Sequence, residues 1–173
     1  MKVITETEQA IRGRRTHKQF ADEPLARDEV EELLDLARWA PNHKLTQPWR
    51  FRILGPETLA RLKEAAGPKE APKLDRAPTL VVVSAKLTGD PLTDEEDVLA
   101  TGAAIYIVML AAHAAGFASY WRTPAVMRTD EGRDVVGLAL DERFVGVIYL
   151  GRPSSEPPAK QRDPLDEVLD YLP

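Results

Sequence analysis

The feature that most constrains this chain is the apolar stretch at residues 103–121, which reads AAIYIVMLAAHAAGFASYW. Its length approaches that of a membrane-spanning helix. However, His113, Gly116 and Ser119 interrupt it, and the residues just before it (94–97, DEED) are acidic and offer no basic anchor. A helix that is apolar on all sides must be buried somewhere. We therefore expect it in a core or a subunit interface and predict no membrane span.

The remaining periodicity predicts helices and strands that do not alternate regularly, so we expect an α+β sandwich. In residues 28–39, Val30, Leu33, Leu34 and Ala37 fall on one helical face. Asp28 with Glu31 resembles a capping box, and Pro41 ends this helix. No linker or repeat divides the chain, so residues 1–173 are expected to form one domain with 153–173 as a C-terminal tail. The expected helices span 5–14, 28–39, 56–66 and 95–115, and the expected strands 50–54, 79–84, 117–121 and 144–150; a short amphipathic stretch follows at 165–172.

Composition excludes several classes of function. The chain has no cysteine, which removes disulfides, thiolate metal sites and cysteine nucleophiles and suits a cytoplasmic protein. A net charge of -5 disfavours general nucleic-acid binding. The three histidines show no metal-ligand spacing, so no metal site is expected. The dinucleotide-binding and phosphate-loop glycine motifs are absent, and the N-terminus lacks the pattern of a signal peptide.

A basic cluster stands out near the start of this acidic chain. Arg12, Arg14, Arg15 and Lys18 lie within seven residues, with Thr16 among them. Arginine donates to phosphate through two parallel hydrogen bonds, lysine adds a point charge, and threonine adds a hydroxyl donor. The cluster is therefore a candidate phosphate site, and the alternative is a solvated helix end.

Three later segments carry further candidate residues, each with an ordinary structural alternative. Residues 40–51 (APNHKLTQPWRF) form a stiff polar loop that suits a ligand rich in hydroxyls and carbonyls, or simply connect a helix to a strand. Residues 117–125 (FASYWRTPA) could border a planar ring, or hold a core tryptophan beside a surface arginine. Residues 159–169 add two cations, or are a solvated tail. The candidates are Asn42, His43 and Gln47 in the loop, Trp121, Arg122 and Thr123 in the second segment, and Lys160 and Arg162 in the tail.

Together these segments resemble the nitroreductase family, especially its short members. RRTHKQF (14–20) is similar to the opening arginine-rich motif, and APNHKLTQPWRF (40–51) to the signature after the second helix. GFASYWRTPA (116–125) followed by FVGVIYLGRP (144–153) resembles the late core, and KQRDPLDEVL (160–169) the closing segment. The motifs occur in the family's order and cover nearly the whole chain.

The resemblance implies a mainly antiparallel sheet flanked by helices, in an intertwined homodimer that binds FMN at its interface. It assigns Arg14, Arg15, Thr16 and Lys18 to the phosphate and ribityl chain, and Lys160 and Arg162 to the phosphate again. It brings Asn42, His43 and Gln47 to the flavin from the partner subunit. Trp121, Arg122 and Thr123 then line the pyrimidine side of the ring or its entrance.

The implied activity is a ping-pong oxidoreductase in which NADPH or NADH reduces FMN and a small-molecule acceptor, nitroaromatic or quinone-like, reoxidises it. FMN carries the chemistry, so no catalytic side chain is assigned. Two alternatives stay open. One is other flavin chemistry of the family, namely dehalogenation, flavin fragmentation or ring dehydrogenation. The other is a non-enzymatic dimer that binds flavin or phosphate.

Overall fold

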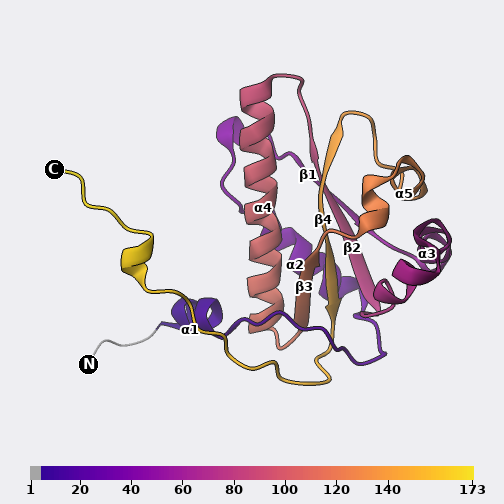
Figure 1. Ribbon diagram of the computed structural model, residues 1–173, viewed down its shortest axis with the longest axis horizontal. Coiled ribbons are helices and arrows are strands. Elements are labelled where there is room, and N and C mark those ends of the chain that lie inside the picture. Colours follow the sequence, from indigo (N-terminus) through magenta and orange to yellow (C-terminus); the bar gives the residue numbers. More distant parts are fainter. Residues whose placement is uncertain (1–4) are drawn as a thin grey trace.

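The computed structural model describes residues 5–173, and its centre is a four-stranded antiparallel sheet (Figure 1). The strand order is β1-β2-β4-β3, with every neighbouring pair antiparallel. β2 carries the run TLVVVSA, and all seven of these residues are buried because helices cover both faces of the sheet. The strands are β1 (Trp49–Ile53), β2 (Thr79–Lys86), β3 (Ala118–Arg122) and β4 (Glu142–Gly151).

Helices cover the sheet on both sides, which makes a three-layer sandwich (Figure 1). α2 (Arg27–Ala37) and α4 (Pro91–Ala114) pack on one face. α3 (Pro56–Glu70) and α5 (Asp130–Val135) lie on the other face. α1 (Glu6–Gly13) lies beside the end of α4 that leads into β3, and the C-terminal tail runs away from the sheet past α1. Four short 3-10 turns complete the fold: η1 (His43–Leu45), η2 (Ala71–Lys73), η3 (Ala125–Arg128) and η4 (Leu165–Glu167).

Alternation along the strands divides the core into two apolar clusters. Val81, Val83 and Ile148 point to the α2 and α4 side. Val82 and Tyr149 point to the opposite side, where they pack with residues of α3 and η3 such as Leu62 and Met127. Successive residues of a strand point to opposite faces of the sheet, and here helices cover both faces.

The structure confirms the predicted α+β sandwich and antiparallel sheet, with corrections at element ends. The capping box predicted at Asp28 and Glu31 is wrong. Helix α2 begins earlier, with Ala26 as its N-cap, and the Ala26 N–H donates to the Glu29 carboxylate at 2.8 Å. The reason is that the buried Leu25 donates its N–H to Thr79 Oγ1 at 3.2 Å, which fixes where the chain turns into the helix. Helix α5 was not predicted, and the stretch 165–172 contains only the short turn η4.

The apolar stretch forms most of α4, a helix of 24 residues. In the described part of the chain, α4 is the one helix long and apolar enough to cross a membrane. One side of it packs on the sheet and α2 through Ala104, Ile105, Val108 and Ala112, all with 0% exposure. α4 is therefore a helix of the protein's own core, as the sequence predicts.

Candidate functional site

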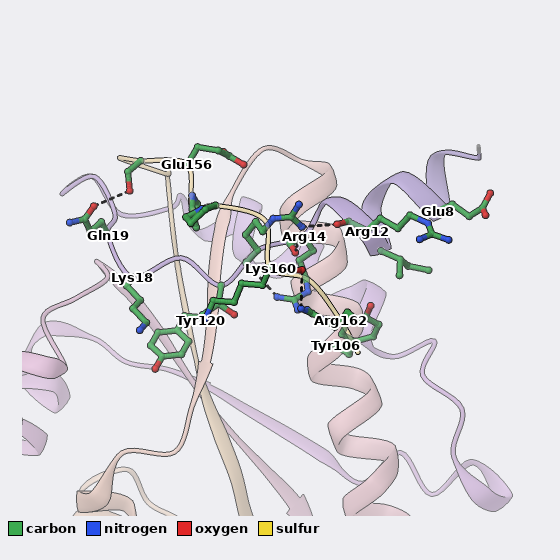
Figure 2. Close-up of a pocket in the computed structure, with 16 residues that line it drawn as sticks. Glu8, Arg12, Arg14, Lys18, Gln19, Tyr106, Tyr120, Glu156, Lys160 and Arg162 are labelled. Atoms are coloured by element: carbon green, nitrogen blue, oxygen red, sulfur yellow. Dashed lines mark hydrogen bonds between the residues drawn. The ribbon is translucent and has the colours of Figure 1, made fainter. Parts of the chain in front are cut away.

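A cavity of about 1210 Å³ lies where the start of the chain, α4, β3 and the C-terminal tail meet (Figure 2). Six cationic side chains line it, and they come from two regions far apart in sequence. Figure 2 shows Lys160 and Arg162 of the tail over the same cavity as Arg12 and Arg14. The six cations are Arg12, Arg14, Arg15, Lys18, Lys160 and Arg162; Thr16, Tyr106 and Tyr120 also line the wall, as do the carboxylates Glu8 and Glu156.

These cations are not neutralised by the described part of the chain. Within residues 5–173 none of the six forms an ion pair. The guanidinium of Arg15 instead donates to the backbone oxygens of Arg12 at 2.6 Å and Arg14 at 3.1 Å. Arg14 lies over the ring of Tyr106 at 5.8 Å from its centroid, and its buried Nε has no hydrogen-bond partner. An unpaired cationic pocket with a buried unused donor is suited to an anionic ligand.

Local contacts fix the basic segment against α4 and β3. A capping box between Thr5 and Glu8 begins α1. Gly13 lets the chain pass α4 closely, since an added Cβ would lie 2.7 Å from His113 Nε2. His17 is buried, and its N–H donates to the Ser119 oxygen at 3.1 Å. Burial lowers the pKa of His17, although the nearby charge of Glu156 opposes this shift. The neutral form of the buried imidazole is therefore favoured.

The polar loop lies at the other end of α4 and is held by its own side chains. Asn42 accepts the N–H of Gln47 through Oδ1 at 2.9 Å and donates through Nδ2 to the Ala40 oxygen at 3.0 Å. Thr46 donates its hydroxyl to Asp97, which is 1% exposed, at 2.6 Å. His43 Nδ1 lies 2.6 Å from Glu96 Oε2. Two adjacent carboxylates of α4 therefore hold the loop.

The loop backbone is strained. Lys44, Leu45 and Gln47 have φ of 52°, 54° and 45°, the left-handed region that costs energy for a residue with a Cβ. Such a conformation persists only when the surroundings impose it, which the contacts of Asn42 and Thr46 do here. Gln47 also lines a smaller cavity of about 570 Å³ beside α2 and β1.

The side chains of the third predicted segment, residues 117–125, lie on both faces of the sheet. Trp121 lies on the α4 side, where an added Cβ on Gly102 would come within 3.7 Å of its indole. The indole Nε1 donates to the Val145 oxygen at 3.4 Å. Arg122 lies on the other side and donates to the Lys73 oxygen at 3.3 Å, while Thr123 follows the end of β3 and is exposed.

The structure therefore brings together six of the twelve predicted site residues. Arg14, Arg15, Thr16, Lys18, Lys160 and Arg162 line the large cavity; Asn42, His43, Gln47, Trp121, Arg122 and Thr123 do not. Along α4, Glu96 beside the loop and Tyr106 in the cavity are ten residues apart, or about 15 Å. Sequence reasoning missed Tyr106 and Tyr120 as cavity residues, because apolar periodicity does not separate a tyrosine at a cavity wall from one in a core.

The sequence and the fold match a known family. The sequence pattern of the nitroreductase family matches residues 11–69 and 67–152. The chain belongs to the nitroreductase family. Among curated relatives, the provisionally named NAD(P)H nitroreductase YfhC of Bacillus subtilis (strain 168) is 29% identical over 171 residues, which cover 90% of this chain and 88% of YfhC.

Solved structures agree with this family membership. A nitroreductase-like family protein from Bacillus cereus superposes with a TM-score of 0.88 at 26% identity, covering 99% of this chain and 98% of that one. A provisionally named nitroreductase from Desulfovibrio desulfuricans, solved in complex with FMN, has a TM-score of 0.82 at 25% identity and covers 99% of both chains. The predicted family and fold are thus confirmed.

Proposed function

We propose that this protein is an FMN-dependent NAD(P)H oxidoreductase that reduces small nitroaromatic or quinone-like acceptors. The observation that carries the proposal is the set of six cations around the large cavity, none of them in an ion pair within residues 5–173, in a chain whose net charge is -5. A phosphate dianion would explain why six cations converge on one cavity that only two carboxylates, Glu8 and Glu156, also line. FMN in the Desulfovibrio desulfuricans relative and NAD(P)H in the name of YfhC support both cofactors.

The residues at the cavity fit the phosphate end of FMN. Arg14 offers the buried, unused Nε, and Thr16 and Lys18 add a hydroxyl and an ammonium on the same wall. Lys160 and Arg162 supply further charge from the tail. The cavity also exceeds the roughly 300–1,000 Å³ that accommodates a typical small ligand. FMN, once bound, supplies the hydride chemistry, and the protein binds and orients it.

A homodimer would account for the three predicted residues of the loop, Asn42, His43 and Gln47. In one protomer the loop 42–47 and the cationic cavity lie at opposite ends of α4, so one chain alone separates the two halves of the site. Two copies of α4 in antiparallel contact would bring the loop of one protomer beside the cavity of its partner. Exposed apolar side chains are available for this contact. They include Leu92 and Leu99 on α4, and Leu165, Val168, Tyr171 and Leu172 in the tail.

The activity follows a ping-pong course in the proposal. In such a course the nicotinamide would give its hydride to FMN and leave, and the acceptor would then occupy the same site. Within the family, dehalogenation or ring dehydrogenation would use the same pocket, and such activity would be recognised by flavin that is retained but not reduced by either nicotinamide. A cytoplasmic location stays a prediction from the sequence.

The phosphate assignment is tested by the double variant Arg14→Ala with Arg15→Ala. Charge-assisted hydrogen bonds contribute about 1.5–3 kcal/mol each, so loss of two of them is expected to lower FMN affinity roughly 100-fold or more. Quenching of flavin fluorescence on titration with flavin-free protein measures this affinity. The matched control is Arg27→Ala, because Arg27 is exposed on α2 and paired only with Glu31. Unchanged FMN affinity in the double variant would refute the assignment.

A further inference from the structure

We propose that His43, oriented by Glu96, is the proton donor to the acceptor in the second half of the reaction. The inference rests on the proposed function. It adds a catalytic side chain to a site in which the cofactor otherwise carries the chemistry.

The pair has the geometry of an oriented imidazole. Nδ1 of His43 lies 2.6 Å from Oε2 of Glu96, and the His43 and Glu96 side chains are 53% and 38% exposed. When the carboxylate accepts the Nδ1 proton, the tautomer and the direction of the ring are both fixed. No residue from 5 to 173 bonds Nε2, so that nitrogen is available to a ligand. A carboxylate at one ring nitrogen and an open second nitrogen are typical of general acid and base histidines.

The loop that carries His43 is rigid enough for such a role. Asn42 donates a hydrogen bond to the Ala40 oxygen and accepts one from the Gln47 N–H, and Thr46 donates its hydroxyl to the buried Asp97. These contacts hold the left-handed backbone at Lys44. Strain that the surroundings maintain is a recurrent property of functional loops. It also makes Asn42 a positioning residue, since its amide bonds the loop backbone through both Nδ2 and Oδ1.

Reduction of the acceptor needs a proton, and His43 is the histidine best placed to supply it. A quinone that receives a hydride on one oxygen needs one proton on the other. In the proposed step the Nε2–H bond of the imidazolium breaks, the second quinone oxygen takes that proton, and solvent later reprotonates the ring. The hydride and its two electrons come from NAD(P)H by way of the cofactor. His17 is buried, and His113 packs against Gly13 at the other end of α4, and the chain has no cysteine.

The test compares two acceptors in the FMN-loaded protein. p-Benzoquinone needs a proton to be reduced, whereas ferricyanide takes single electrons and needs none. We expect His43→Gln to lower the ratio of the benzoquinone rate to the ferricyanide rate about 100-fold, the usual contribution of a general acid. Glu96→Gln should lower this ratio in the same direction. Glu95→Gln is the matched control, since it removes the same charge one residue away with no contact to His43.

A second readout does not depend on activity. In flavin-free protein, the ring of His43 should give a hydrogen-bonded Nδ1–H signal in proton–nitrogen NMR spectra. Glu96→Ala, which removes the acceptor that glutamine would keep, should abolish this signal, and Glu95→Ala should keep it. An unchanged acceptor ratio in His43→Gln, or no Glu96-dependent signal, overturns the inference while the proposed function stands. Failure of the unmodified protein to bind FMN overturns both.

Discussion

At the scale of single residues, buried carboxylates decide which parts of this chain are fixed. Asp97 holds the polar loop, and Glu142 ties together three strands of the sheet. Glu142 is 7% exposed and accepts from Ser84 Oγ at 2.5 Å on β2 and from Arg52 Nη2 at 2.9 Å on β1. A buried carboxylate of this kind is stabilising only while its partners are present.

The Glu142 network predicts a dependence of stability on pH. Burial tends to raise the pKa of Glu142, but the hydrogen bonds from Arg52 and Ser84 together outweigh it and hold the pKa below the ordinary value. The stabilisation is therefore complete above the unfolded pKa, near 4.3, and is lost as the pH falls through the folded pKa. Glu142→Gln should cost about 1–3 kcal/mol at pH 7, and this difference should shrink below about pH 4.3.

Urea unfolding at pH 7 and at about pH 3.5 measures this difference directly. Glu32→Gln is the control, because Glu32 is exposed on α2 and has no hydrogen bond or ion pair among residues 5–173. A cost for Glu142→Gln that stays constant or grows in acid would contradict the assignment of the network.

At the scale of elements, helices and strands with a regular apolar period could be predicted from the sequence. Elements whose position depends on particular tertiary contacts could not. β2 is a continuous β-branched run and α2 has a clear apolar face, so both were found. Helix α5 has the sequence DEGRDV, which has no apolar period, and its position depends on Thr129 as N-cap and on packing of Gly132 against Val126. The start of α2 depends on a contact of Leu25 with a strand 54 residues away, which no local pattern contains.

Strand β4 carries a glycine whose role the structure explains. A Cβ on Gly146 would lie 2.0 Å from Trp121 Nε1 and 2.6 Å from its Cδ1, so the indole would have to move. We expect Gly146→Ala to lower the free energy of unfolding by about 1–3 kcal/mol through overpacking. Thermal or urea unfolding of the variant measures this loss.

Gly102→Ala is the matched control, since Gly102 lies on α4 and faces the same indole. Its Cβ would meet Trp121 at an ordinary 3.7 Å, and alanine has the higher helix propensity. This variant should be neutral or stabilised by up to about 1 kcal/mol. Equal effects of the two substitutions would show that Trp121 does not occupy the described position.

At the scale of the whole molecule, the two halves of the proposed site are far apart within one chain. The cationic cavity could be anticipated because Arg14, Arg15 and Lys18 are close in sequence, and a cluster of cations points to an anionic ligand before the fold is known. In the proposed site, the place of the 42–47 loop and of Trp121 relative to the flavin would depend on how two copies meet. The contact between two copies decides this position, and the spacing of residues along one chain does not predict it.

The shared site predicts that flavin binding depends on dimer formation. Leu99 is 68% exposed on α4, and a charge there should disrupt an apolar contact between two copies. Leu99→Glu should convert a dimer into a monomer in light-scattering measurements and should release the flavin with it. Leu140→Glu, at a fully exposed loop position, is the control that should keep both dimer and flavin. A wild-type monomer that retains FMN would contradict the shared site.

The most direct measurement of the central claim is the absorbance spectrum of purified protein after incubation with FMN and desalting, followed by anaerobic NADPH and, in a parallel sample, NADH. The account predicts flavin bands that survive desalting, bleach with at least one nicotinamide and return when p-benzoquinone is added. A colourless protein would contradict FMN binding. Retained bands that neither nicotinamide bleaches would contradict the NAD(P)H oxidoreductase activity and leave a flavoprotein of different chemistry.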